Sequence, residues 1–95
     1  MGALRSYIDI ADLAVPVRWE KEFGREGPLE VEIGFGTGEY ITDQAGRDPG
    51  SNFLGFEQSP DRIVKTIRKI EQAGLCNVKV LKIDAALAFR YLLSK

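Results

Sequence analysis

The sequence predicts an α/β fold in which a parallel sheet of about three strands is flanked by helices. Three stretches have strand character, and each is followed by a stretch in which apolar residues recur at helical spacing: 29–33, 52–57 and 77–84. This regular alternation of strand and helix predicts parallel strands joined by right-handed crossovers. Ser59-Pro60-Asp61 marks the start of the second helix, because Ser is a favoured N-cap and Pro a favoured first helical residue.

The first predicted strand, 29–33, leads directly into a loop in which every second residue is glycine: Gly34, Gly36 and Gly38. A helix is predicted over 39–45. Glycine has no Cβ, so such a loop can turn tightly and let a ligand lie against the backbone. The first N–H groups of the following helix carry partial positive charge, which suits a carboxylate or a phosphate. The stretch therefore predicts a ligand site of the nucleotide type.

The spacing within this loop departs from two common phosphate-binding motifs. The dinucleotide fingerprint Gly-x-Gly-x-x-Gly would place its third glycine at position 39, which is Glu39. The Gly-Lys-Ser/Thr ending of a P-loop is missing. Gly-x-Gly-x-Gly after an acidic residue at the strand end instead resembles motif I of the class I S-adenosylmethionine (SAM)-dependent methyltransferases.

A longer segment resembles the bacterial tRNA (guanine-N7)-methyltransferases. The resemblance rests on Glu-Ile-Gly-Phe-Gly-x-Gly-Glu at 32–39 with an aromatic residue after it, and on Pro-Val-Arg-Trp-Glu-Lys-Glu-Phe-Gly at 16–24. It runs from about Pro16 to the end of the chain. It implies a Rossmann-like half-domain with strand order 3-2-1, SAM as cofactor, and methyl transfer to N7 of guanine in tRNA. The family's Asp-Pro-Trp-Pro-Lys-type motif is missing from this sequence, so the resemblance implies catalytic residues beyond Lys95 and an inactive isolated segment.

An acidic residue stands at or near the end of each predicted strand: Glu32, Glu57 and Asp84. Ligands of open α/β sheets bind outside the carboxyl ends of the strands, so these carboxylates are predicted to line one site. Glu57 lies 19 residues after Gly38, close to the spacing at which an acid holds a ribose, and its carboxylate can accept from both ribose hydroxyls. The alternative for Glu57 is a solvated acid at a strand end.

The family resemblance assigns SAM-binding roles to the three acids one by one. Glu32 is expected nearest the methionine ammonium, directly or through water. Asp84 is expected near the adenine amino group, with the Ala85 N–H close to a ring nitrogen. Each has a structural alternative, since Glu32 can lie in solvent and Asp84 can be the N-cap of the third helix.

The composition excludes several kinds of site. The 95 residues include no histidine and one cysteine, Cys76, which excludes an internal disulfide and Ser–His or Cys–His catalysis and argues against a metal site. The net charge of −1 is unlike that of a domain that holds RNA by itself. No apolar run is long enough to cross a membrane and no signal peptide is visible, so we expect a cytoplasmic protein without membrane contact.

The predicted organisation is an N-terminal arm with a short helix over 1–28 and the SAM-binding half-domain over 29–95. Trp19 and Phe23 are expected to pack on the sheet, in a helical turn that ends at Gly24. Strand 29–33 is expected to form an exposed edge, because strand 4 of the family fold is missing, and to mediate self-association.

The second helix carries a basic side that is either a solvated face or an RNA contact: Arg62, Lys65, Arg68 and Lys69. Two other functions stay open, a SAM-dependent methyltransferase with another acceptor and a non-catalytic nucleotide-binding or interaction module.

Overall fold

The computed structural model describes residues 6–93 and confirms the α/β fold; residues 1–5 of the predicted arm and residues 94–95 lie outside the described part. Three parallel strands pair in the order β1-β2-β3: β1 (Leu29–Ile33), β2 (Asn52–Glu57) and β3 (Val78–Lys82). The register places Glu32 beside Gly55 and Glu57 beside Lys82. The sheet therefore has the predicted order 3-2-1, with β1 at one edge.

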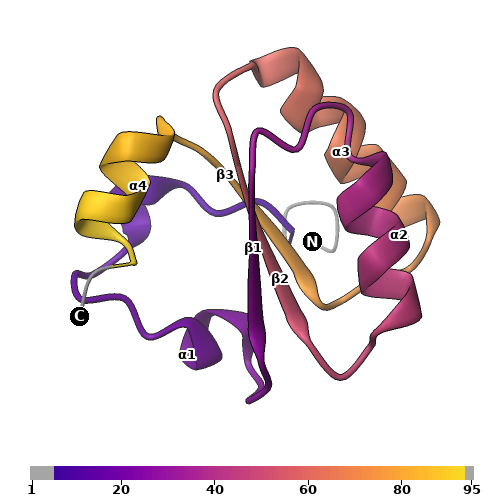
Figure 1. The fold of residues 1–95 in the computed structure, drawn as a ribbon, viewed down its shortest axis with the longest axis horizontal. Helices are drawn as coiled ribbons and strands as arrows, with labels where there is room; N and C mark the ends of the chain where they lie inside the picture. The colour runs from indigo at the N-terminus through magenta and orange to yellow at the C-terminus, as the bar shows by residue number, and fades with distance from the viewer. Residues whose placement is uncertain (1–5, 94–95) are drawn as a thin grey trace.

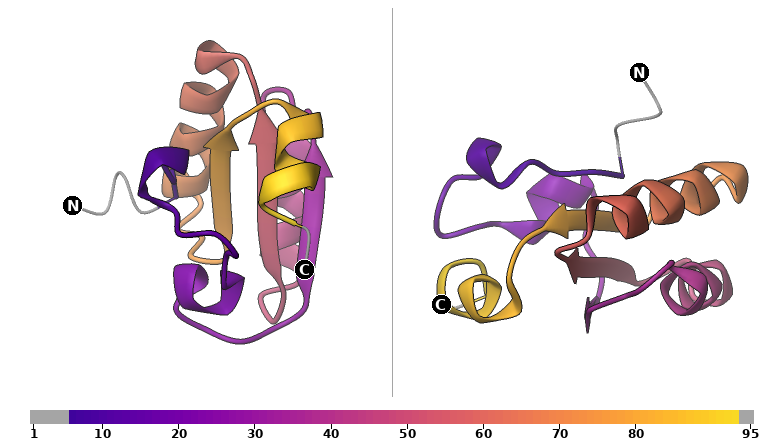
Figure 2. Two further views of the ribbon diagram at one scale, coloured as in Figure 1. Left: turned by 90° about the vertical axis from the view of Figure 1, so that its left-hand side faces the viewer. Right: turned by 90° about the horizontal axis from the view of Figure 1, so that it is seen from above.

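Helices cover both faces of the sheet (Figures 1 and 2). One face carries two helices, α2 (Glu39–Arg47) and α3 (Pro60–Gln72). The other face carries three shorter elements: the 3₁₀ helix η2 (Ile10–Asp12), α1 (Trp19–Phe23) and α4 (Ala85–Tyr91). The sheet is thus the middle of three layers, and the β1–α2 loop lies at its carboxyl end (Figure 1).

The predicted boundaries follow from local signals. The first two strands have the predicted bounds, whereas the third is shorter than the predicted 77–84, and Asp84 is the N-cap of α4. Ser59 is the N-cap of α3 as predicted, and its hydroxyl oxygen accepts from the Arg62 N–H at 3.4 Å. Gly24 ends α1 with a left-handed φ of 71°, a conformation that glycine adopts without strain.

Two apolar clusters fill the spaces between the layers. Side chains alternate across a strand, so Phe53 faces α2 and α3 while Leu54 faces α1 and α4. Trp19 packs against the second cluster, and its Nε1 donates to the Leu92 carbonyl at 3.2 Å. The prediction that Trp19 and Phe23 pack beside the sheet is therefore confirmed.

The two edges of the sheet differ in how they are covered. At the β3 edge, the Val80 N–H donates to the Ser6 carbonyl at 2.7 Å and the Ile8 N–H donates to the Val80 carbonyl at 3.0 Å. No pattern in the sequence predicted this pairing. At the other edge, among residues 6–93, β1 pairs with β2 alone, and its apolar side chains are 37–40% exposed. Self-association through this exposed edge stays a prediction.

The turn after α2 is organised by one buried side chain. The Asn77 amide donates to the carbonyls of Ala45, Asp48 and Ser51 at 3.1, 3.2 and 3.0 Å. It thereby satisfies carbonyl groups at the end of α2 and in the turn that leads to β2. Its neighbour Cys76 is exposed. No helix in the described part of the chain combines the length and the apolarity that crossing a membrane requires.

Candidate functional site

The loop between β1 and α2, residues 34–38, is the centre of the candidate site. Gly34, Gly36 and Gly38 have φ values of 65°, 62° and 88°, whereas no other residue type between 6 and 93 has a positive φ. The Gly38 N–H donates to the Phe35 carbonyl at 3.0 Å and closes a tight turn. Because a Cβ makes positive φ unfavourable, glycine at alternate positions lets the chain turn from strand to helix.

These glycines serve two different purposes. A Cβ on Gly38 would lie 2.5–2.9 Å from three side-chain atoms of Thr66, so Gly38 allows the loop to pack directly on α3. A Cβ on Gly34 or Gly36 would meet no atom within 4 Å. At those two positions the bare backbone borders open space at the carboxyl end of the sheet, where a ligand can approach it.

The sheet fixes the near end of the loop. The Gly34 N–H donates to the Phe56 carbonyl of β2 at 2.7 Å. The Phe35 side chain is buried against Gly55, where an added Cβ would lie 2.6 Å from the Phe35 ring. At the far end, the N-cap residue Gly38 has no side chain to cap α2, and the Glu39 carboxylate accepts from its own backbone N–H in the first turn.

The Glu57 carboxylate connects this loop to the end of β2. Its Oε1 accepts from the Gly36 N–H at 3.2 Å, and its Oε2 accepts from the N–H groups of Gln58 and Ser59, each at 3.0 Å. Burial raises the pKa of Glu57, but these three N–H donors and the charge of Arg62 outweigh it, so the pKa lies below its ordinary value. Glu57 is therefore a buried and ionised carboxylate in contact with the glycine loop.

Asp84 takes the structural alternative that the sequence analysis left open. Its Oδ1 caps α4 by accepting from the N–H groups of Ala86 and Leu87 at 2.9 and 3.3 Å. Its Oδ2 accepts from the Gln58 side chain at 2.8 Å, which joins the ends of β2 and β3. Ala85 is the first residue of α4. Asp84 is exposed and a carboxylate has about four acceptor positions, so capping leaves room for a ligand contact.

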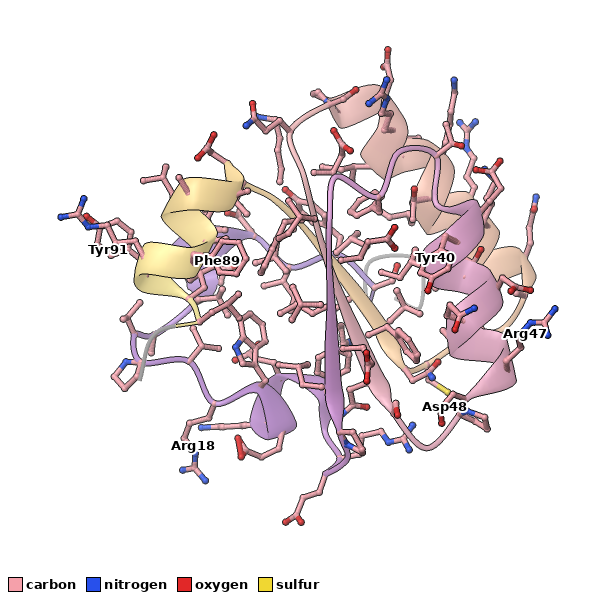
Figure 3. The ribbon with its side chains drawn as sticks, viewed as in Figure 1. Arg18, Tyr40, Arg47, Asp48, Phe89 and Tyr91 are labelled. Atoms are coloured by element: carbon pink, nitrogen blue, oxygen red, sulfur yellow. The ribbon has the colours of Figure 1, made fainter. Side chains whose placement is uncertain are left out.

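Glu32 lies on the outer flank of the site. It lines an open pocket of about 310 Å³ between β1 and α2, together with Tyr40 and Gln44. Tyr40 projects from the start of α2, and Asp48 marks the opposite end of this helix (Figure 3). Glu32 Oε1 is buried without a hydrogen-bond partner among the described residues, and burial raises the pKa of Glu32. A buried carboxylate oxygen of this kind favours a donor or a cation beside it.

Helix α3 supports the loop from its other side. Lys69 Nζ donates to the Thr37 carbonyl at 2.6 Å and to Glu39 Oε2 at 2.9 Å. The Thr37 hydroxyl donates to Glu39 Oε1. The Thr37 hydroxyl first and Lys69 second lower the pKa of Glu39 to about 2. Glu39, at the position of the third glycine in the dinucleotide fingerprint, therefore links the loop to α3.

The predicted basic side of the second helix, α3, is not uniform, because Lys69 differs from the other basic residues. Its side chain is 34% exposed and contacts the glycine loop, whereas Lys65 and Arg68 are exposed. The sequence carried no signal that separates Lys69 from the other basic residues, because the burial of its neighbour Thr66 is seen only in the structure. Lys69 follows Thr66 by three residues, which places it about 60° around the helix from Thr66 and beside the buried stripe. Gln58, which contacts Asp84, was not predicted from the sequence either.

The structure thus brings some of the predicted residues together and leaves Glu32 apart from them. Gly36 and Glu57 are in direct contact, Asp84 is joined to the same edge through Gln58, and Glu32 lines a separate pocket. Bare backbone, a helix N-terminus without an N-cap side chain and the ionised Glu57 carboxylate suit a ligand that carries hydroxyl, amino and carboxylate groups. Within residues 6–93, no group of three or more acidic, cysteine or histidine side chains is placed to hold a metal ion.

The fold and the glycine loop define an α/β domain of the methyltransferase type. A solved structure described as an antibiotic-related methyltransferase superposes with a TM-score of 0.63, covering 77% of this chain and 40% of that one at 20% identity. At this identity the likeness shows the fold alone. The chain belongs to the family described as "Putative methyltransferase", whose model matches residues 26–95.

Curated relatives of this chain are named tRNA (guanine-N(7)-)-methyltransferase. The protein of Thermotoga maritima is 42% identical over 77 residues, which cover 81% of this chain and 25% of that protein. The protein of Geobacillus kaustophilus is 44% identical over 68 residues, covering 72% of this chain and 31% of its own length. The protein of Cupriavidus necator is 39% identical over 79 residues, covering 83% of this chain and 30% of its own length. The chain therefore spans between a quarter and a third of these relatives.

Proposed function

We propose that this chain forms the SAM-binding part of a tRNA (guanine-N7)-methyltransferase. The observation that carries the proposal is the loop in which Gly34 and Gly36 leave bare backbone next to the ionised Glu57. SAM combines a ribose with an amino-acid group, and the carboxylates and helix N-terminus offer matching partners. The names of the relatives support tRNA as the substrate. Because the chain spans only part of them, activity and substrate are proposed for the whole protein.

Glu57 would hold the ribose with one oxygen. A carboxylate has about four acceptor positions. Two N–H groups donate to Oε2, whereas Oε1 accepts only from the Gly36 N–H among the hydrogen bonds described above. Glu57 would therefore accept from one ribose hydroxyl, at Oε1, in place of the two hydroxyls expected from the sequence.

The other predicted residues keep their proposed roles. Glu32 would hold the methionine ammonium, directly or through water, which would supply the donor that its buried Oε1 lacks. Asp84 and the Ala85 N–H would hold the adenine, and Gln58 keeps Asp84 at the end of β2. The backbone of Gly34, Gly36 and Gly38 would form the wall against which the methionine part lies.

In the proposed reaction, the role of this segment is to bind and orient the cofactor. When bound, SAM supplies an electrophilic methyl group. Guanine N7 already carries a lone pair, so the transfer depends on positioning more than on a strong base. The chain's own residues would fix the orientation of the cofactor, and the residues that position guanine are proposed to lie outside this segment. We therefore expect the isolated chain not to methylate tRNA.

Calorimetry with S-adenosylhomocysteine and with NAD tests the cofactor. We expect S-adenosylhomocysteine to bind more tightly than NAD. Glu57→Ala should weaken its binding by about 1–3 kcal/mol, since a hydroxyl and the loop lose their acceptor. Glu71→Ala on the exposed side of α3 is the matched control and should bind as the unmodified chain does. Tighter binding of NAD, or unchanged binding by Glu57→Ala, would overturn the assignment.

A methyl-transfer assay on unmodified tRNA tests whether this segment binds the cofactor without positioning guanine. The isolated chain should transfer no tritiated methyl from SAM, because the proposed site holds the cofactor without positioning guanine. Turnover on the order of 1 per second, which is within the usual range for enzymes, would show that these residues contain the whole active site.

A further inference from the structure

We propose that Lys69 is a positioning residue that holds the glycine loop in its ligand-binding conformation. This inference rests on the proposed function, because it concerns the loop to which SAM is assigned. Lys69 is 32 residues from Thr37 in sequence, and α3 brings its ammonium group to the Thr37 carbonyl at 2.6 Å. The role requires no contact between Lys69 and the cofactor.

The contact restrains the peptide unit that precedes Gly38 in the loop. The peptide between Thr37 and Gly38 has its carbonyl bound by Lys69 and its N–H bound by the Phe35 carbonyl. Glycine populates positive and negative φ about equally, so Gly38 itself does not prevent this peptide from flipping. With both polar groups bound, a flip breaks two hydrogen bonds at once.

The anchor is rigid because the helix that carries it is buried on one side. The buried side of α3 consists of Ile63, Thr66 and Ile70, whose exposed fractions are 5%, 0% and 1%. Thr66 packs directly against Gly38. Lys69 lies three residues after Thr66, so steric contact and hydrogen bond act on neighbouring parts of the loop. Glu57 holds Gly36 from the β2 side, and Lys69 holds Thr37 from the α3 side.

Of the two Lys69 contacts, the bond to the carbonyl carries the larger effect. Glu39 is 73% exposed, and ion pairs in water contribute little. The Thr37 carbonyl is partly buried, and a hydrogen bond from a charged donor is stronger than a neutral one. Glu39→Gln should therefore have a smaller effect on the loop than Lys69→Met.

A loop held in this way is already ordered when the ligand arrives. Gly34 and Gly36 form the open wall of the site, so their mobility in the free protein would be lost on binding at a cost in affinity. Holding the loop beforehand removes part of that cost. Removing Lys69 should therefore weaken binding although Lys69 does not contact the ligand.

The test compares Lys69→Met, Lys69→Arg and the matched control Lys65→Met, one turn earlier and exposed. Amide exchange of Gly36 and Gly38 in the ligand-free chain reports on the loop, calorimetry reports binding of S-adenosylhomocysteine, and urea unfolding reports global stability. Lys69→Met should accelerate exchange at both amides and weaken binding, each about tenfold or more. Lys69→Arg keeps the charged donor and should retain most of the amide protection and most of the affinity. Lys65→Met should match the unmodified chain in both measurements.

The results separate this inference from the proposed function. Unchanged exchange and affinity in Lys69→Met would overturn the positioning role, as would faster exchange of all amides together with a lower unfolding midpoint. Failure of the unmodified chain to bind S-adenosylhomocysteine would instead overturn the proposed function. In that case the exchange of Gly36 and Gly38 would still decide whether Lys69 holds the loop.

Discussion

Replacing Gly38 by alanine tests the direct packing of the glycine loop on α3. Two terms oppose the substitution. Gly38 has a φ of 88°, and a left-handed conformation costs a residue with a Cβ about 1–2 kcal/mol. The new Cβ would also lie 2.5–2.9 Å from Thr66 atoms, and overpacking of this kind costs about 1–3 kcal/mol. The free energy of unfolding should therefore fall by about 2–5 kcal/mol.

Gly36→Ala is the matched control for this experiment. Gly36 has a similar φ of 62°, but a Cβ there would meet no atom within 4 Å. Only the backbone term applies, so Gly36→Ala should lose about 1–2 kcal/mol. The difference between the two variants isolates the contact with Thr66.

Urea unfolding measures both variants, with the midpoint and the slope fitted together. Adding Thr66→Ala to Gly38→Ala removes two of the three crowded atoms, Oγ1 and Cγ2, and should recover about 1 kcal/mol or more relative to additivity. Equal losses for Gly38→Ala and Gly36→Ala, or strict additivity in the double variant, would refute the reasoning.

Three further predictions follow from single features. Asn77→Ala should lower the free energy of unfolding by about 2–3 kcal/mol in urea, because three carbonyls at the end of α2 and in the turn to β2 lose their donor; a loss below about 0.5 kcal/mol, roughly that of a surface change, would contradict this. Glu39 should titrate near pH 2 by carboxyl NMR, so that its stabilising contribution is complete above its ordinary pKa and lost as the pH falls through about 2; Thr37→Val should raise that midpoint, and an ordinary midpoint in the unmodified chain would count against the contact. Light scattering should show a concentration-dependent mass above that of a monomer, reduced by Val31→Lys on the exposed β1 edge, whereas a monomer at every concentration would exclude association.

Local patterns in the sequence determined most of the fold. Alternating residues predicted β1, the glycine spacing predicted the turn after it, and Ser59 predicted the start of α3. Each of these features depends on neighbours within a few residues, so their physical cause is visible in the sequence. The family resemblance was also visible in the sequence, because the motif at 32–39 is a local one that combines a strand end, a loop and a helix start.

The tertiary structure alone decided how the side chains of the site are used. The contacts of Lys69 with Thr37 and of Glu57 with Gly36 join residues 32 and 21 positions apart, and both depend on how helix and loop pack on the sheet. The pairing of Ser6 with Val80 has the same origin. Sequence spacing places an acid at the end of a strand, but the supply of nearby N–H donors determines whether its oxygens face the backbone or a ligand. That supply exists only once the chain has folded, which is why Glu57 was found bound to the loop, whereas Glu32 Oε1 has no hydrogen-bond partner among residues 6–93.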